Sequence, residues 1–190
     1  MKFYFKYILF VLIVIFIECT TKKENMPVSD IHVETPFQEL DSTTLCYYQG
    51  SKLQWKLNSL NIKKILSDTG NIFASPVALV VYDSVGKEVS RVLSDSGLCD
   101  ASFKSFSVWG NVFVKAQNGI KVRSNILNWN LKTHLITSQD YVQITTPKGD
   151  ILRGKGLEAA EDFSWWKFKK DVSGRFPNFK ERVEKGDEFY

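Results

Sequence analysis

The chain has 190 residues, with 25 Lys and Arg against 21 Asp and Glu and a formal net charge of +4. This basic excess is too small and too evenly spread for nucleic-acid binding to be the default expectation. The length is sufficient for one domain with a substantial core.

The N-terminus has the features of an export signal. Lys2 and Lys6 precede an uncharged apolar run over residues 7–17. A basic start followed by an apolar core of about a dozen residues has the size of a secretory signal and is short for a membrane span. We therefore expect the rest of the chain to lie outside the cytoplasm.

The predicted export signal covers residues 1–18 and is followed by Cys19, after which the sequence becomes polar. This arrangement is similar to a bacterial lipoprotein signal, in which Cys19 is lipidated and becomes the mature N-terminus, although Glu18 stands where a small residue is usual. The alternative is an uncleaved anchor, with residues 3–17 as a short membrane helix. Either alternative tethers the chain to a membrane.

Residues 19–44 are predicted to form an extended linker, because they are polar around Pro27 and Pro36 and show no period. The folded domain is then predicted over residues 45–190. It contains Cys46 and Cys99, which either form a disulfide, with a stabilisation of ~3–4 kcal/mol, or are two small buried residues.

The first part of the domain alternates apolar and polar residues. In the segment 52–58, Leu53, Trp55 and Leu57 are expected to share the inner face of a strand. Residues 58–66 fit either a second strand or a helical turn. Residues 76–82 form a nearly continuous apolar run, which is typical of a strand covered on both faces.

The segment 106–157 alternates almost throughout and is interrupted only by turn signals such as Asn118-Gly119 and Pro147-Lys148-Gly149. This pattern predicts serial antiparallel hairpins, each with one face buried and one exposed to water. We therefore predict an all-β protein with a long apolar face.

The C-terminal part leaves two alternatives open. Gly154 and Gly156 point to the same face of a strand, so either something bulky passes there or the strand has a bulge. Residues 163–170 combine aromatic residues with lysines, which suits either an interfacial lipid contact or the last strands of the sheet with a lysine-protected edge. Residues 176–185 are predicted to form a short helix.

No catalytic constellation is recognisable. The two histidines, His32 and His134, have no Cys or His at metal-ligand spacing, and neither a G-x-S-x-G motif nor a P-loop occurs. We therefore expect no enzymatic activity, no cofactor and no metal.

Several short motifs in a fixed order carry a family resemblance. They are Trp55-Lys56-Leu57, Gly110-Asn111-Val112, Gly119-Ile120-Lys121-Val122, Leu127-Asn128-Trp129-Asn130, Ile136-Thr137-Ser138-Gln139-Asp140-Tyr141-Val142 and Gly154-Lys155-Gly156-Leu157-Glu158. In this order, and behind an export signal, residues 45–176 resemble LptC, the membrane-anchored periplasmic subunit of the lipopolysaccharide export system.

The resemblance implies a twisted, open β-jellyroll of consecutive antiparallel strands that encloses a hydrophobic channel. It further implies that the domain sits on the periplasmic side of the inner membrane. There it would accept lipopolysaccharide from an inner-membrane ABC transporter and pass it to a soluble periplasmic protein of the same fold, through edge-to-edge contacts.

With this resemblance, the alternating apolar residues become candidates for the channel wall. They are Trp55, Leu57, Val80, Tyr82, Phe106, Val108, Val112, Val114, Ile120, Val122, Leu127, Trp129, Val142 and Ile144. Gly154 and Gly156 match a glycine-bearing part of the family near the outgoing end, so we assign them to partner docking. The alternative is a structural or adhesive envelope lipoprotein whose apolar face is only core. A glycan-cleaving enzyme lacks a recognisable carboxylate pair.

Overall fold

The computed structural model describes residues 36–66, 70–177 and 179–186. The predicted export signal and Cys19 lie outside the described residues, as does most of the predicted linker. Within the described ranges, no helix is long and apolar enough to cross a membrane.

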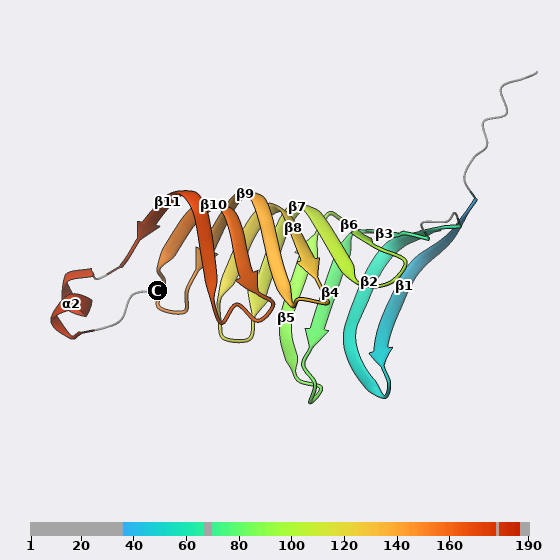
Figure 1. Cartoon of the computed structure of the whole chain (residues 1–190), viewed down its shortest axis with the longest axis horizontal. Helices are drawn as coiled ribbons and strands as arrows, with labels where there is room; N and C mark the ends of the chain where they lie inside the picture. The colour runs from blue at the N-terminus through green and yellow to red at the C-terminus, as the bar shows by residue number, and fades with distance from the viewer. Residues whose placement is uncertain (1–35, 67–69, 178, 187–190) are drawn as a thin grey trace, which may run out of the picture. The chain divides into compact units, whose positions relative to one another are not determined.

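Antiparallel β-strands make up most of the described chain, as the sequence predicted (Figure 1). The strands are β1 (Phe37–Gln49), β2 (Lys52–Ile65), β3 (Ile72–Ser75), β4 (Val77–Tyr82), β5 (Glu88–Ser94), β6 (Ser96–Cys99), β7 (Ser105–Ala116), β8 (Lys121–Asn130), β9 (Leu135–Thr145), β10 (Ile151–Ala160) and β11 (Trp166–Arg175). A short helix, α2 (Phe179–Glu184), follows the last strand.

The long strands each contribute to two layers. In β7, residues 106–109 pair with β6, whereas residues 113–116 pair with β5. In β2, residues 61–64 pair with β3 and residues 55–58 pair with β4. One long strand therefore belongs to one layer in its first half and to the other layer in its second half.

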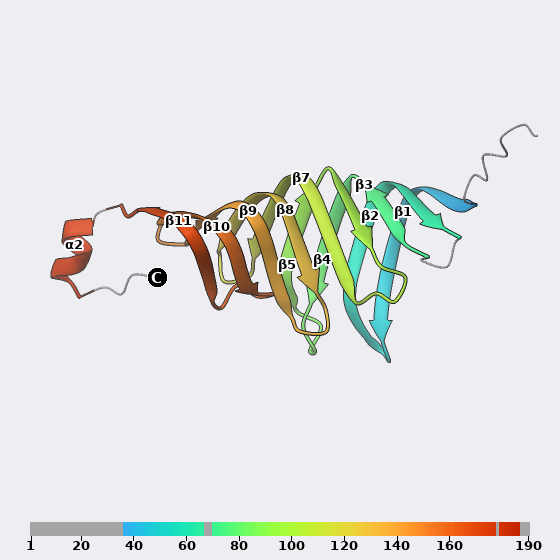
Figure 2. The same ribbon diagram turned by 45° about the horizontal axis from the view of Figure 1, so that its top comes forward.

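We call the two layers layer 1 and layer 2. Layer 1 consists of β3, β6 and the segments 61–64, 105–109, 126–130, 135–138 and 157–160. Layer 2 consists of β4, β5 and the segments 52–58, 112–116, 121–124, 142–145 and 151–155. Figure 2 shows the strands of the two layers one behind the other. The arrangement agrees with the predicted jellyroll.

Backbone irregularities mark the line along which the strands bend. The register of β7 against β8 shifts between Trp109 and Val112, where Gly110 and Asn111 have φ values of 75° and 49°. Serine hydroxyls recur at these bends: Ser59, Ser94 and Ser124 each donate to the carbonyl two residues further on, at 2.9, 3.0 and 2.9 Å. A bend removes ladder partners from the backbone, and the hydroxyl satisfies one exposed carbonyl at each place.

The core lies between the two layers and consists of the inward residues of alternating strands. The side chains of Val114, Val122 and Ile144 have no exposed surface. Because side chains alternate along a strand, the intervening positions, such as Lys115, Arg123 and Gln143, face outward.

The folded region begins earlier than the predicted boundary at residue 45. β1 starts at Phe37 and pairs along β2, with Leu40 opposite Ile62, so residues 37–44 are strand and not linker. Most of β1 is exposed because it lies at the edge of the sheet. An exposed edge strand needs no apolar period, which explains why the sequence pattern did not indicate it.

The possible disulfide is not formed, because both Cys46 and Cys99 are free. Leu45 and Tyr47 turn toward the core, so Cys46 between them is exposed on the outer side of β1. Cys99 is buried instead, and burial together with nearby Asp100 raises the pKa of its thiol to about 12. The second prediction, of small buried residues, is correct for Cys99 alone.

Residues 58–65 continue β2 as a strand rather than forming a helical turn. In the C-terminal part, residues 166–175 form the last strand, and α2 confirms the predicted short helix. At Gly156, φ is 72° and the register of β10 against β9 shifts between Lys155 and Leu157, so this glycine lies at a bulge. Gly154 lies directly beneath the ring of Phe168, which leaves no room for a Cβ.

Candidate lipid-binding site

The structure brings most of the predicted channel residues together between the two layers. Twelve of them belong to one buried core cluster: Trp55, Leu57, Phe106, Val108, Val112, Val114, Ile120, Val122, Leu127, Trp129, Val142 and Ile144. They come from β2, β7, β8, β9 and the turn before β8, so the cluster extends along much of the sheet. The alternation in the sequence therefore identified one continuous apolar interior.

Val80 and Tyr82 do not belong to this interior, so their assignment to the channel wall is wrong. Both lie on the outward side of β4, while their neighbours Leu79 and Val81 are buried at 1% and 5% exposure. Since β4 is apolar on both faces, the sequence did not reveal which set of alternate residues points inward, and the wrong parity was chosen.

Several interior residues were not among the predicted wall. Leu79, Ile62 and Leu157 are almost completely buried, and Phe163 in the β10–β11 turn has no exposed surface. Leu157 follows the bulge at Gly156, so it faces inward directly after an inward glycine. Phe163 lies in a turn with a φ of 54°, and no periodicity marks a buried residue there.

One end of the interior is lined by aromatic rings. Tyr47 stacks on Trp55 and on Phe103 with ring centroids 5.3 Å apart in each pair. Phe106 meets Trp55 edge-on at 5.1 Å and stacks on Trp129 at 5.9 Å. Tyr47 and Trp55 come from the layer 2 side, on β1 and β2, whereas Phe103 lies in the loop between β6 and β7 on the layer 1 side. These rings therefore hold the two layers together at this end.

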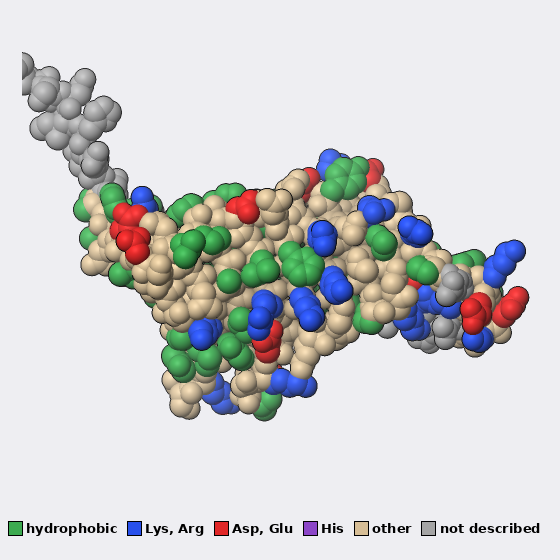
Figure 3. Space-filling view, turned by 180° about the vertical axis from the view of Figure 1, so that it is seen from behind, with side chains coloured by type: hydrophobic (Ala, Val, Ile, Leu, Met, Phe, Trp, Pro, Cys, Tyr) green, Lys and Arg blue, Asp and Glu red, His purple; other side chains and the backbone are tan. Residues whose placement is uncertain are grey.

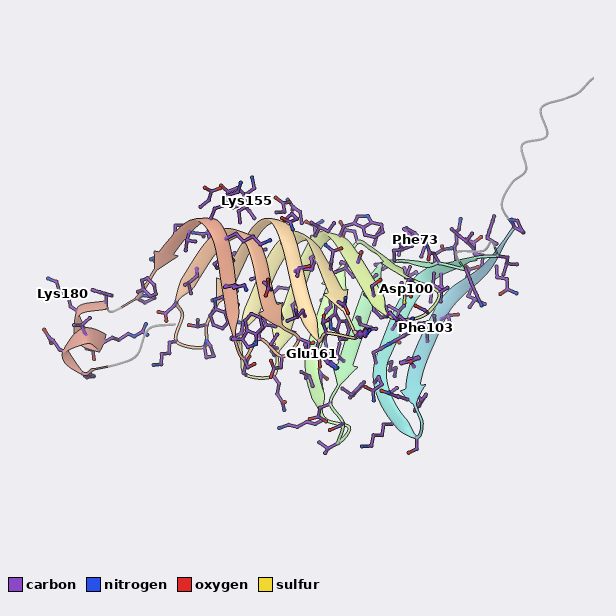
Figure 4. All side chains as sticks on the ribbon, viewed as in Figure 1. Phe73, Asp100, Phe103, Lys155, Glu161 and Lys180 are labelled. Carbon is purple, nitrogen blue, oxygen red and sulfur yellow. The ribbon has the colours of Figure 1, made fainter. Side chains whose placement is uncertain are left out.

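A polar rim lies beside the aromatic end. Glu161 accepts a hydrogen bond from Nε1 of Trp129 at 3.2 Å, and its other oxygen lies 3.0 Å from Nδ1 of His134. The rim borders a groove of about 330 Å³ that Tyr47, Trp55, Phe103 and Trp129 also line. Figure 4 shows Phe103 and Glu161 on the same side of the strands. The groove therefore combines an apolar floor with a polar edge.

The layers are joined where their turns meet, along what we call the seam. Nδ2 of Asn118, in the β7–β8 turn, donates to the carbonyl oxygens of Asp162 at 3.1 Å and Phe163 at 3.2 Å, in the β10–β11 turn. The first turn extends from layer 2 and the second from layer 1. Asn118 and the buried Phe163 therefore close the interior at this point.

The interior is closely packed where Leu79, Val92, Val114 and Ile136 meet, and the cavity between them has a volume of about 30 Å³. That is room for one or two water molecules and far too little for an acyl chain. Two apolar walls in water reduce their exposed area by packing on each other, so closure is the expected state without a ligand.

Electrostatics add little to the interior. Among the described residues, no group of His, Cys, Asp and Glu could hold a metal ion. His134 is exposed and lies at the rim, where it contacts Glu161. Buried polar side chains include the hydroxyls of Ser90 and Ser138 and, beside α2, the ion pair of Asp150 with Arg182. The arrangement is suited to enclosing an apolar ligand by moving the layers apart.

Comparison with known proteins gives one finding. A family model described as lipopolysaccharide-assembly, LptC-related, matches residues 7–176, a range that includes all eleven strands and ends before α2. A search of curated proteins finds no match.

Proposed function

The chain belongs to the LptC family, whose members take part in lipopolysaccharide transport; from this premise we propose that the interior between the two layers binds the acyl chains of lipopolysaccharide. The domain then acts as a relay. It accepts lipopolysaccharide from an inner-membrane ABC transporter and passes it along a periplasmic bridge of β-jellyrolls toward the outer membrane.

The observation that carries this proposal is the continuous apolar surface on the facing sides of the two layers. Enclosing an acyl chain removes its surface from water, which stabilises the complex by about 25 cal/mol per Å². Separation of the layers costs mainly the exposure of their apolar faces, which an enclosed acyl chain covers again. The two hydrogen bonds of Asn118 at the seam add only about 1 kcal/mol net each to this cost. Entry of lipid through the seam needs no covalent chemistry from the domain.

The free strands at the two ends of the sheet support a place within a bridge. β1 and β11 each pair with one neighbour only among the described strands. Unpaired backbone groups on an edge strand accept a further strand from another protein. We assign one edge to the periplasmic domains of the transporter and the other to the soluble bridge protein. Gly154 and Gly156, beside β11, are assigned to the outgoing contact.

The periplasmic orientation follows from the family, and the anchor is part of the proposal. We assign anchoring on the inner membrane to either a lipid on Cys19 or an uncleaved helix over the N-terminal apolar run. Replacement of Cys19 by Ser distinguishes the two. In the first case, mass spectrometry should detect acyl groups on the wild-type protein that the variant lacks. In the second case, the two masses should differ only by the substitution.

Site-specific photo-crosslinking of the full chain in the cell envelope tests the lipid-binding proposal. A photoreactive phenylalanine at Val114 or Ile144, both without exposed surface, should form adducts with lipopolysaccharide. The matched control is Trp109, on the outward side of layer 1. Adducts at Trp109 as strong as those at Val114, or none at either buried position, would contradict the proposal.

A structural envelope lipoprotein is the competing function, and the small volume of the interior cavity, about 30 Å³, favours it. In that case the facing residues are only a packed core and never meet lipid. The same crosslinking experiment separates the two functions, because a permanently closed core gives no lipid adduct at Val114 under any condition.

A further inference from the structure

The outward side of layer 2 carries an unusual concentration of positive charge. Its cations, on β5, β7, β8 and β10, are Arg91, Lys115, Lys121, Arg123, Arg153 and Lys155. Figure 3, which shows the molecule from behind, displays Lys and Arg side chains gathered around apolar ones in the middle of this side. We call this surface the basic face.

Three of these cations lie directly opposite one another across neighbouring strands. Arg91 on β5 is the pairing partner of Lys115 on β7, which is in turn the partner of Lys121 on β8. Like charges at directly opposed positions of a sheet destabilise it. A row of three such positions therefore costs folding stability, which a negatively charged partner would offset.

The next row combines arginines with groups that hold them in place. The guanidinium of Arg123 lies 5.4 Å from the ring centroid of Phe113, and Nε of Arg153 donates to Oε1 of Gln143 at 2.9 Å. These four residues, together with Tyr141, line a groove of about 510 Å³. The groove places two oriented guanidinium groups, whose geometry suits phosphate, beside aromatic surface.

Carboxylates do not neutralise this face. Over the ranges that the structure describes, Arg91 alone among its cations forms a salt bridge, with Glu88 at 3.0 Å. Two carboxylates beside Tyr141 accept hydrogen bonds from neutral groups, Asp140 from Asn125 at 3.2 Å and Asp171 from the hydroxyl of Tyr141 at 3.2 Å, and they form no salt bridge with the described cations of this face. Five cations therefore keep their charge available to a ligand.

The outward side of layer 1 has a different character. Phe73, Leu98, Trp109 and Ile126 occupy it on β3, β6, β7 and β8, and the rings of Phe73 and Trp109 lie 5.9 Å apart. Figure 4 shows Phe73 and Lys155 pointing away from the strands. The outward side of layer 1 thus presents aromatic and aliphatic surface beside cations such as Lys63, which lies directly opposite Phe73.

We propose that the basic face binds the surface of an anionic phospholipid bilayer. The cations and Tyr141 extend over five neighbouring strands, about 19 Å at the spacing of strands in a sheet. A surface of this extent can contact several lipid phosphates at once. Tyr141, which is 53% exposed, lies directly opposite Lys155 and supplies a ring that suits the interface.

The basic face is separate from the proposed lipid-transport site. Its residues lie on the outer side of layer 2, whereas the transported acyl chains are assigned to the inner side. Each Lys or Arg near an anionic membrane contributes about fivefold to the partition coefficient. Removal of two of these charges should therefore weaken the contact by about 25-fold, and salt should screen it.

The test uses the full chain in nanodiscs with a photoreactive phenylalanine in place of Tyr141. Phospholipid adducts are measured by mass spectrometry in discs with about one third phosphatidylglycerol and in discs of phosphatidylcholine alone. The matched control places the same group at Trp109, on the outward side of layer 1. Because the N-terminal segment is identical in every arm, its own membrane contact does not affect the comparison.

We expect adducts at Tyr141 that are several-fold stronger in the anionic discs and nearly absent in Arg123→Glu/Arg153→Glu or in 0.5 M NaCl. Equal adducts in both kinds of disc, or at Trp109 to the same extent, would overturn the proposal. Complete competition by millimolar inorganic phosphate would also overturn it, by indicating a site for free phosphate. If the double variant does not fold, the comparison of low and high salt with the otherwise unchanged chain still tests the proposal. In a folded double variant, lipopolysaccharide adducts at Val114 should be unchanged.

Discussion

Replacement of Phe163 by Ala tests whether the seam holds the two layers together. The ring of Phe163 is completely buried although it lies in a turn, and Asn118 donates to its carbonyl from the opposite layer. Truncation of a fully buried Phe to Ala typically costs ~3–5 kcal/mol of stability, through lost burial and the cavity that remains. In a domain of this size, that corresponds to a decrease of roughly 6–20 °C in the melting temperature.

The same change should favour lipid entry, because Phe163 stabilises the closed arrangement. If only about 1.4 kcal/mol of the loss falls on the difference between closed and open layers, the open population rises roughly tenfold. We therefore expect Phe163→Ala to lower the urea midpoint at unchanged m-value while it increases the rate of lipopolysaccharide binding. The two readouts then move in opposite directions.

The matched control is Phe113→Ala, a Phe truncation on the outward side of β7. It should cost about 1 kcal/mol or less, since half-exposed positions lose little burial. A loss below about 1 kcal/mol for Phe163→Ala would refute the role of this residue in packing. A normal loss of stability with lipid binding reduced in proportion would refute the seam as the route of entry.

Four further predictions concern other parts of the domain. Arg182→Ala removes the ion-pair partner of Asp150, whose side chain has no exposed surface, and should lower the free energy of unfolding by ~3–5 kcal/mol. The control Lys185→Ala breaks the exposed pair with Glu181 and should lower it by less than about 1 kcal/mol. Thermal unfolding measures both. Gly156→Arg should abolish co-purification with the bridge protein, and unchanged co-purification would contradict the docking role. The change should also cost about 1–2 kcal/mol of stability, because the φ of 72° disfavours a side chain and Lys169 lies 3.0 Å from the new Cβ. The control is Gly86→Arg, at an open turn with a φ of 85°. Burial opposes ionisation of Asp100, but hydrogen bonds from Ser102, Ser105 and backbone amides outweigh this effect and lower its pKa to about 2. Asp100→Asn should therefore destabilise the domain above pH 3.8, and the difference in unfolding free energy between variant and wild type should shrink as the pH falls toward 2. A difference in unfolding free energy that is independent of pH would contradict this prediction. Cys46 should react with a maleimide in the native domain, and Cys99 only after unfolding, since it is buried and its pKa is about 12; protection of Cys46 would indicate that β1 is covered.

The sign of the Asp100 prediction follows from the direction of its shift. A carboxyl whose pKa is lower in the folded state binds fewer protons than the unfolded chain between about 2 and 3.8. Stability from this group is therefore complete above pH 3.8 and is lost as the pH falls through the folded pKa. Measurement of urea unfolding for the wild type and the variant at pH 6, 4 and 2.5 checks this window.

Alternation was a reliable guide where each strand has one apolar and one polar face. In β7, Val112 and Val114 were correctly placed inside, with Phe113 between them and Lys115 after them outside. The same reasoning was wrong for Val80 and Tyr82, because β4 is apolar on both sides and either parity fits the sequence. It also missed β1, whose exposed edge position places no demand on its composition.

The sequence alone determined the strands of the central segment and the turns between them, because side-chain alternation and turn residues are local properties of the chain. The resemblance to LptC, carried by short motifs in a fixed order, was confirmed by the family match. Only the tertiary structure decided that Asn118 meets the turn at Asp162, that the layers close on each other, and that cations from four different strands share one face. These features depend on which strands become neighbours across long sequence separations, and no local pattern encodes that pairing.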